Sequence, residues 1–380
     1  MAKPKLCLIP SAIGDKLYSV LPSDGSGDFD FTRATTATRV NKDGLIETVA
    51  SGDARLNYPM IDGKVVGCPS HLLEPQRTNL LTYSEDFTQW SLAGGSSISS
   101  NQSISPNGTL NADNVSSGEV YVNGLGISGN TYTFSCYYKG NAGETFIQNV
   151  YDGSNHNRFT RTFNGKWQRF SITVTLTNSG IFYLVDDRTG GNSSSFSVWG
   201  AQLEQGSYAT SYIPTNGSAA TRNADTGVPS NKGIQTGDIS SYVDGSNGVF
   251  YFEGSFADFN VVNRITLSNS TGGFGGDYIS IATNNSGSTE ENKRTEIVVF
   301  YKIETPLSTG VEKAIVNDVR DNFKMAISWD GTTLKGYANG VEFFSNSETA
   351  FGGFDRIYFS RADNNIAGVF HGKQKDLRVY

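Results

Sequence analysis

The chain has 380 residues, a length at which two or three domains are expected. Only 18% of its residues are charged and 43 are glycine, whereas long amphipathic helices need many Glu, Lys, Ala and Leu residues. The formal net charge is −7, and no run of Lys and Arg offers the clustered cations that phosphate neutralisation needs. We therefore expect an all-β protein that binds no nucleic acid.

The cysteines and the apolar runs bear on the cellular compartment. Cys7, Cys68 and Cys136 are scattered and odd in number, which favours reduced thiols over a disulfide framework. The apolar run at 6–9 is too short for a signal peptide, and no stretch approaches the ~20 residues that span a bilayer. We expect synthesis in a cytoplasm, without membrane insertion.

Residues 1–77 show little periodicity and many turn residues. The segment 24–28 (DGSGD) is a turn cluster, and 41–44 (NKDG) predicts a hairpin turn between strands at 37–40 and 45–49. We interpret 1–77 as an extended, partly stranded anchoring segment. Its low apolar content means that it needs another surface to pack on.

Residues 78–222 form the first unit with clear strand alternation. Expected strands are separated by Gly- and Asn-rich breaks, and they lie at 131–138, 167–176, 181–185 and 195–199. The spacing favours a β-sandwich over βαβ units. The segment 124–129 (GLGISG) matches a dinucleotide-binding pattern, but a strand follows it where that site needs a helix, so we take it as a chance match.

A polar passage at 223–247 is the best linker candidate, although Ile234, Ile239 and Tyr242 suggest that part of it packs down. Residues 248–380 then form a second sandwich. In it, Asn339 and Gly340 predict a type I′ hairpin turn, because both positions need a positive φ.

The carboxylate pair Asp186 and Asp187, followed by Arg188, is a candidate for binding calcium or a sugar hydroxyl. The alternative is a solvated strand end with an arginine partner. Adjacent carboxylates point to opposite faces of a strand, so they make a poor acid/base pair. We predict no catalytic residues and no cofactor, with structural calcium left open.

No zinc-ligand spacing, nucleophile elbow or P-loop accompanies the three histidines. Two dispersed carboxylates would suffice for a glycosidase, but no feature of the sequence marks such a pair. We therefore expect no enzymatic activity.

Exposed aromatic rings are where sugar binding is expected, because the apolar face of a sugar stacks on a ring while polar groups bind its hydroxyls. We assign the four tryptophans to core packing. Weaker candidates for a ring on which a sugar stacks are Tyr121, Tyr137, Tyr151 and Tyr337. Together with Asp187 and Arg188, Tyr121, Tyr151 and Tyr337 make up our carbohydrate-binding candidates.

Four sequence blocks, in this order, resemble tail and head fibre proteins of tailed bacteriophages. They are 29–35 (FDFTRAT) with 37–47 (ATRVNKDGLIE), 72–81 (LLEPQRTNLL) running into 83–87 (YSEDF) and Trp90, 199–206 (WGAQLEQG), and 209–215 (ATSYIPT). The pattern of 78–222 resembles galactose-binding-like jelly rolls found in many carbohydrate-binding modules.

The last unit resembles the laminin-G/concanavalin-A-like lectin sandwich. This resemblance rests on 325–331 (MAISWDG), 334–340 (LKGYANG) and 368–380 (GVFHGKQKDLRVY). The expected fold is therefore all-β, with an extended N-terminal anchor followed by two jelly-roll sandwiches.

The resemblance implies a non-enzymatic virion structural protein, a head or tail fibre or spike subunit made in the host bacterial cytoplasm and displayed on the virion surface. Its N-terminal segment would dock on capsid or tail proteins. Its sandwiches would bind host glycans weakly, with avidity from many copies. A homo-oligomer is implied, with a trimer favoured over a dimer.

Two alternatives remain open. One is a purely structural capsid decoration or adaptor protein that binds only other virion proteins. The less favoured one is a polysaccharide-degrading tailspike, which usually needs a long β-helix repeat that this chain lacks.

The stretch 72–81 is interpreted as a hinge between the anchor and the first sandwich. We expect its leucine pairs, Leu73 and Leu80 among them, to pack under the first sandwich. Glu74 and Arg77 would fix the angle at which the chain leaves it.

Overall fold

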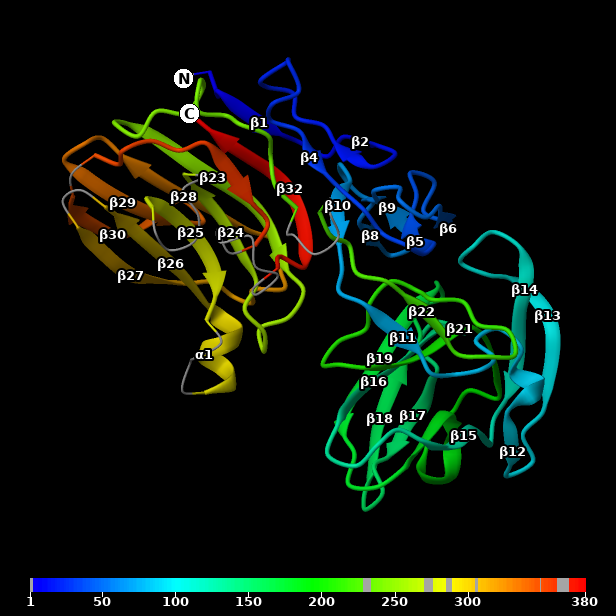
Figure 1. Ribbon diagram of the computed structural model, residues 1–380. Helices are drawn as coiled ribbons and strands as arrows, with labels where there is room; N and C mark the ends of the chain where they lie inside the picture. Colours follow the sequence, from blue (N-terminus) through cyan, green and yellow to red (C-terminus); the bar gives the residue numbers. More distant parts are fainter. Residues whose placement is uncertain are drawn as a thin grey trace.

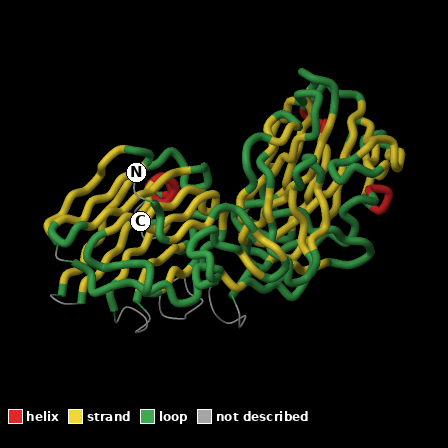
Figure 2. Tube along the Cα trace, turned by 90° about the horizontal axis from the view of Figure 1, so that it is seen from above, coloured by secondary structure: helices red, strands yellow, loops and turns green. Residues whose placement is uncertain are grey.

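The computed structural model describes residues 3–227, 234–269, 276–284, 289–304, 307–348, 350–360 and 369–380. The chain forms two β-sandwiches that lie side by side, as both views show (Figure 1, Figure 2). The helical elements of these residues are short: η1 (Phe87–Gln89), η2 (Asp187–Thr189) and α1 (Glu290–Thr295). None of the described helices has the length and apolarity to cross a membrane. The expected all-β fold is confirmed.

The first sandwich consists of two five-stranded antiparallel sheets. Its strands are β12 (Ser91–Ala93), β13 (Ile98–Ile104), β14 (Leu110–Ser116), β15 (Glu119–Leu125), β16 (Thr131–Lys139), β17 (Thr145–Tyr151), β18 (His156–Thr162), β19 (Gln168–Thr175), β20 (Gly180–Asp186) and β21 (Ser195–Gln205). Sheet A has the order β12-β15-β20-β17-β18, and sheet B the order β13-β14-β21-β16-β19.

Alternation along β16 shows how this sandwich forms its core. Tyr132, Phe134, Cys136 and Tyr138 point inward and pack with Phe146 and other apolar side chains of the facing sheet. β16 follows the 124–129 glycine motif, so the strand expected after that motif is confirmed.

The second sandwich is built from ten strands of the C-terminal part of the chain and three from the N-terminal segment. The C-terminal strands are β23 (Gly248–Phe256), β24 (Arg264–Ser268), β25 (Tyr278–Thr283), β26 (Glu296–Ile303), β27 (Ser308–Ile315), β28 (Phe323–Trp329), β29 (Thr333–Ala338), β30 (Val341–Ser347), β31 (Arg356–Tyr358) and β32 (Gly372–Val379). The predicted turn between β29 and β30 is confirmed, since Asn339 and Gly340 have φ values of 49° and 85°.

The N-terminal segment forms short strands throughout. They are β1 (Leu6–Leu8), β2 (Ala12–Ile13), β3 (Lys16–Leu17), β4 (Phe29–Asp30), β5 (Ala37–Val40), β6 (Ile46–Val49), β7 (Leu56–Asn57), β8 (Met60–Ile61), β9 (Lys64–Val65), β10 (Ser70–Leu73) and β11 (Arg77–Asn79). The predicted hairpin at 41–44 is confirmed by the pairing of β5 with β6.

The surface on which this segment packs is the second sandwich. The larger sheet has the order β30-β29-β28-β23-β32-β10-β7, and β1 also pairs with β32. Leu6, Leu8, Phe29 and Phe31 are fully buried in the same core as the C-terminal strands. The two termini therefore lie next to each other (Figure 1, Figure 2), and the first sandwich is inserted between β10 and β23. Docking of this segment on a virion stays a prediction.

The passage at 223–247 also packs along its described part. Ile234 and Ile239 are fully buried in the second sandwich, and Tyr242 packs against the same core, as the sequence suggested. Just before it, β22 (Ala220–Arg222) pairs with β11. Outside the described residues lies 228–233 of the expected linker.

The leucine pairs of 72–81 pack on different sandwiches, which corrects the expectation that they lie under the first one. Leu73 belongs to β10 and is buried in the core of the second sandwich. Leu80 and Leu81 pack in the core of the first sandwich. The stretch therefore crosses from one hydrophobic core to the other.

A buried ionic network lies at this crossing. Asp225 accepts hydrogen bonds from Arg33 (3.0 Å) and Arg55 (2.5 Å). Glu74 accepts from Arg55 (2.7 Å) and from Arg222. All five side chains are at least nine-tenths buried. The network links segments that are far apart in sequence: Arg55 joins the two carboxylates, and Glu74 is buried between Arg55 and Arg222.

Candidate functional site

The outer face of sheet A carries a group of aromatic side chains. Strand alternation turns Tyr121 of β15, Tyr183 of β20 and Asn149 of β17 to the side away from the core, and all three lie in register across the sheet. Tyr151 of β17 lies opposite His156 of β18 on the same face.

Four of these rings form a continuous row, which we call the aromatic row: Tyr121, Tyr183, His156 and Tyr151. Their successive centroid distances are 5.2, 6.0 and 4.9 Å. His156 is exposed, Tyr121 and Tyr151 are half-buried, and Tyr183 is 5% exposed. The row thus offers ring surface at both ends, and the buried ring of Tyr183 supports its centre.

A carboxylate holds two arginines beside the row. Asp186 accepts hydrogen bonds from Arg188 (2.6 and 3.0 Å), Arg158 (3.1 Å) and Asn149 (2.7 Å). The Arg188 guanidinium also lies 5.1 Å from the centre of the Tyr183 ring, a cation–π arrangement. Burial raises the pKa of Asp186, but the bonds and charges of Arg188 and Arg158 outweigh it, so the pKa lies below its usual range. The carboxylate therefore stays ionised and fixes both cationic groups.

Asn149 connects this carboxylate to the aromatic row. Its amide nitrogen donates to Asp186 and lies 2.9 Å from Nδ1 of His156. The ionised Asp186 fixes the amide orientation, so Nδ1 of His156 must accept and Nε2 carries the proton. Burial, with the charges of Arg158 and Arg188, lowers the pKa of His156 and favours this neutral form.

The Asn149 amide oxygen is the unsatisfied group of this face. It is buried, and none of the described residues gives it a hydrogen-bond partner. A buried acceptor without a donor costs about 1–3 kcal/mol, and such groups in native structures call for an explanation.

The predicted carbohydrate-binding residues are only partly brought together. Tyr121, Tyr151 and Arg188 share the outer face of sheet A. Asp187 turns away from it, since one of its oxygens accepts from the backbone of Ile147 (3.3 Å), and burial raises the pKa of Asp187 to about 6.

The two remaining tyrosine candidates lie on other surfaces. Tyr337 lies in the second sandwich, opposite Glu342 on β30. Tyr137 lies on sheet B, with the Arg169 guanidinium 5.3 Å from its ring centre.

The weak calcium candidates Asp186 and Asp187 point in different directions, and two guanidinium groups occupy Asp186. Within the described ranges, no group of three or more His, Cys, Asp or Glu side chains is arranged to hold a metal ion.

The sequence analysis missed Tyr183, His156, Asn149 and Arg158. Alternation in 181–185 marks Tyr183 as facing opposite to Phe182. Grouping it with Tyr121 and His156, however, requires knowing that β20 pairs with both β15 and β17. The order of strands in a sheet cannot be deduced from the periodicity of a single strand.

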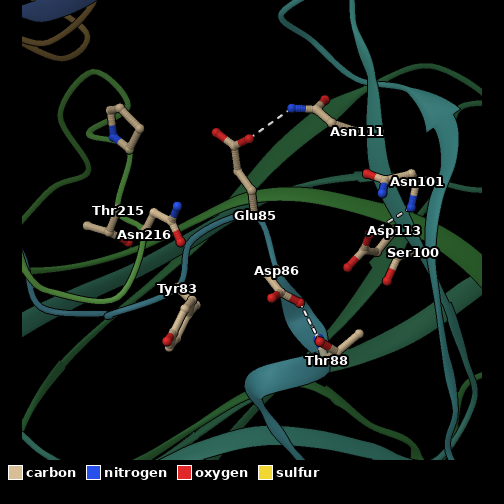
Figure 3. Close-up of a pocket in the computed structure, with 11 residues that line it drawn as sticks. Tyr83, Glu85, Asp86, Thr88, Ser100, Asn101, Asn111, Asp113, Thr215 and Asn216 are labelled. Atoms are coloured by element: carbon tan, nitrogen blue, oxygen red, sulfur yellow. Dashed lines mark hydrogen bonds between the residues drawn. The ribbon is translucent and has the colours of Figure 1, made fainter.

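Apart from the aromatic row, a hollow of about 590 Å³ lies at the edge of the first sandwich, where η1 approaches β13 and β14 (Figure 3). Glu85 accepts from Asn111 and Tyr212 (both 2.8 Å), and Asp113 accepts from the backbone of Asn101 (3.0 Å). Burial raises the pKa values of Glu85 and Asp113. These carboxylates take donors from the chain itself, so the hollow is explained as the way the η1 loop is fastened to the sheet.

No protein-family model and no curated protein matches the sequence. Solved structures with some likeness include carbohydrate-binding modules and laminin G domains. The CBM40 module of Ruminococcus gnavus IT-sialidase, bound to α2,3-sialyllactose, is 16% identical over 36% of this chain and 75% of its own, with a TM-score of 0.29. At that TM-score, this likeness carries no conclusion about a ligand.

Two other solved structures cover more of the chain. The tandem CBM22 domains of Paenibacillus barcinonensis Xyn10C cover 80% of this chain and 97% of their own, at 10% identity and a TM-score of 0.25. Mouse laminin α1 domains LG4-5 cover 76% and 89%, at 9% identity and a TM-score of 0.26. Both TM-scores are too low to bear on function.

Proposed function

We propose that the protein is a non-enzymatic glycan-binding protein and that the aromatic row on sheet A is its binding face. The observation that carries this proposal is the combination of a ring surface with fixed polar groups beside it. The rings of Tyr121 and Tyr151 suit the apolar face of a sugar, while Arg158, Arg188 and Nε2 of His156 suit its hydroxyl oxygens.

The unpaired oxygen of Asn149 strengthens this choice. A sugar hydroxyl is a donor as well as an acceptor, and a ligand that moves the side chains over Asn149 would give that oxygen a partner. The face holds no open pair of carboxylates, since Arg188 bridges Asp186 and Glu119 (3.2 Å). This arrangement favours binding over hydrolysis.

We further propose that the chain is a head or tail fibre or spike subunit on a bacteriophage virion, with other virion proteins as partners. The support is the resemblance of the four sequence blocks. A homotrimer, or failing that a dimer, would repeat the weak face and raise its avidity by on the order of 10²–10⁴.

A purely structural decoration or adaptor protein is the second candidate. Exposed apolar side chains on the N-terminal segment favour it, namely Ile13 (75% exposed) and Val20 (51% exposed). They give the segment a surface for a protein partner that needs no glycan.

The test is a glycan array probed with the full-length protein and with Tyr121→Ala, Tyr151→Ala and the control Tyr337→Ala. We expect the first two variants to lose roughly tenfold in apparent affinity, because each removes a stacking ring. The control changes a half-buried tyrosine of the other sandwich. Equal binding by all proteins would rule out the aromatic row, and absence of any binding would favour the structural candidate.

Release of reducing ends from host capsule would instead identify the chain as a polysaccharide-degrading tailspike. An image of a virion labelled on this chain would test the particle assignment separately. A particle without the label would exclude a virion role and leave the glycan result standing.

A further inference from the structure

Three parts of the chain surround a cavity of about 210 Å³ at the junction of the two sandwiches. Thr38 and Arg39 come from the β5 strand, Arg169 from sheet B, and Lys373 from β32 of the second sandwich. The cavity therefore lies behind the first sandwich, on the sheet opposite to the aromatic row.

Lys373 is the cationic group of this cavity without a partner. Its side chain remains exposed, and among the described residues its amino group has no ion pair or hydrogen bond. Leu72 lies opposite it on β10, two positions before Glu74. The protein atoms around the cavity partly desolvate this charge and lower the pKa of Lys373, although the side chain keeps access to solvent.

The nearby carboxylates are already engaged by other donors. Glu74 already accepts from Arg55, Arg222 and both polar groups of Ser211. Asp225 accepts from Arg33, Arg55 and the backbone of Glu74. Three buried guanidinium groups thus face only these two carboxylates. Arg169 and Lys373 add two further positive charges, against the one buried carboxylate of Glu204, which accepts from Thr210.

Arg169 supplies a second incompletely used donor. Its terminal nitrogens donate to the carbonyl of Thr210 (2.5 Å) and the hydroxyl of Ser135 (3.0 Å), while its buried Nε has no partner in the part of the chain that the structure describes. Tyr137 also lines the cavity, and burial raises the pKa of its hydroxyl, which therefore keeps its proton as a donor. The lining combines a net positive charge with unused donors.

We propose that this junction cavity binds a small oxyanion of the sulfate, phosphate or carboxylate class, between Lys373 of one sandwich and Arg169 of the other. Such an anion neutralises the charge excess and forms charge-assisted hydrogen bonds. Because it contacts both sandwiches and the N-terminal segment, it fastens them to each other. Its source is either a free inorganic ion or the acidic group of a charged sugar.

The test measures binding of sodium sulfate and thermal unfolding of the full-length protein, at constant ionic strength set with sodium chloride. We expect sulfate to bind and to raise the Tm, since a ligand of the native state stabilises it. Lys373→Met should weaken sulfate binding roughly tenfold or more, and Arg169→Gln should act in the same direction. Lys335→Met, on β29, is the matched control and should bind as the wild type does.

Further measurements distinguish an inorganic ion from a charged sugar, and a charge-conserving variant keeps the test valid if Lys373→Met does not fold. Lys373→Arg keeps the charge and should retain binding even if Lys373→Met unfolds. Glucuronate binding without glucose binding would identify a carboxylate-bearing sugar, whereas sulfate binding alone would identify an inorganic ion.

The proposal is overturned if sulfate stabilises no more than chloride, or if it stabilises Lys373→Met as much as the wild type. Tyr121→Ala should leave sulfate binding unchanged, so this result is independent of the glycan test.

Discussion

The guanidinium of Arg188 lies over the ring of Tyr183, with 5.1 Å between its central carbon and the ring centre. Asp186 holds the arginine there through two hydrogen bonds. The aromatic row therefore has a cationic neighbour in a fixed position. Without the bonds to Asp186, the arginine side chain would rotate freely and would not stay over the Tyr183 ring.

Arg188→Met should weaken glycan binding roughly tenfold with little effect on stability. Because the Arg188 side chain is 40% exposed, we expect a loss of unfolding free energy of about 1 kcal/mol or less. The control is Arg320→Met, since Arg320 pairs with Asp318 and lies 5.1 Å from the Phe259 ring in the other sandwich. Glycan-array binding and urea unfolding of both variants check this prediction. An equal loss of glycan affinity in Arg188→Met and Arg320→Met would contradict it.

Glycan binding should also depend on the charge state of His156. Burial and the neighbouring arginines lower the pKa of His156, so the neutral form persists below the ordinary value of 6.5. Binding should hold from pH 8 to 6.5 and fail only at lower pH, when protonation of Nδ1 breaks the contact with Asn149. A proton-detected NMR titration of the imidazole locates the transition; a pKa above 6.5 would refute this assignment.

Fold stability should fall on acidification because of His71. It is fully buried, its Nδ1 lies 2.5 Å from Gln374, and its Nε2 accepts from the backbone of Ser11 (3.0 Å). Burial lowers the pKa of His71 to about 4. The unfolded chain therefore binds more protons between pH 6.5 and 4, and folding loses about 3 kcal/mol as the pH falls through that window.

Urea unfolding at pH 7 and pH 4 compares the wild type with His71→Gln. The acid-induced loss of stability should be about 3 kcal/mol smaller in the variant. His371, whose pKa burial also lowers to about 4, is present in both proteins and cancels in the comparison. The same acid-induced loss of stability in the wild type and in the variant would show that His71 is charged in the native state at pH 4.

Breaking the buried network should cost much more unfolding free energy than breaking a partly exposed surface pair. Glu74→Gln leaves Arg55 and Arg222 short of a counter-charge, so we expect a loss of about 3–5 kcal/mol of unfolding free energy. Glu47→Gln, in the partly exposed surface pair with Arg39, should cost about 1 kcal/mol or less. Chemical denaturation measures both, and similar values for the two would disprove a net role for the network.

Leu73→Asp and Leu80→Asp should affect different sandwiches. Leu73 is buried in the core of the second and Leu80 packs against that of the first. Differential scanning calorimetry should show the corresponding transition lowered in each variant. A shift of the same transition in both would restore the interpretation from sequence, in which both leucines lie under the first sandwich.

Local signals in the sequence predicted local structure well. Alternation at 131–138 predicted β16, and the Asn339–Gly340 pair predicted its hairpin, because both depend on neighbouring residues only. The pairing of His71 with Gln374 joins positions 303 residues apart, and no periodicity encodes it.

The same limit explains the result for the candidate site. Tyr121 and Tyr151 stood out as strand tyrosines, but the residue that unites them, Tyr183, depends on the order of strands in sheet A. The place of Glu74 between the two units suggested that it fixes the angle at which the chain leaves the first sandwich. Its two buried arginine neighbours, Arg55 and Arg222, come from segments whose contact only the fold establishes.

The pairing of β32 with both β1 and β10 sets an order of events during synthesis. Until β32 has been made, β1 lacks its strand partner and β10 pairs only with the two-residue strand β7, whereas the first sandwich has all its own strands before then. The inserted sandwich can therefore fold while the host sandwich is still incomplete. The apolar side chains of the N-terminal strands stay without a core in the meantime, and this is the stage at which the nascent protein is most exposed to aggregation.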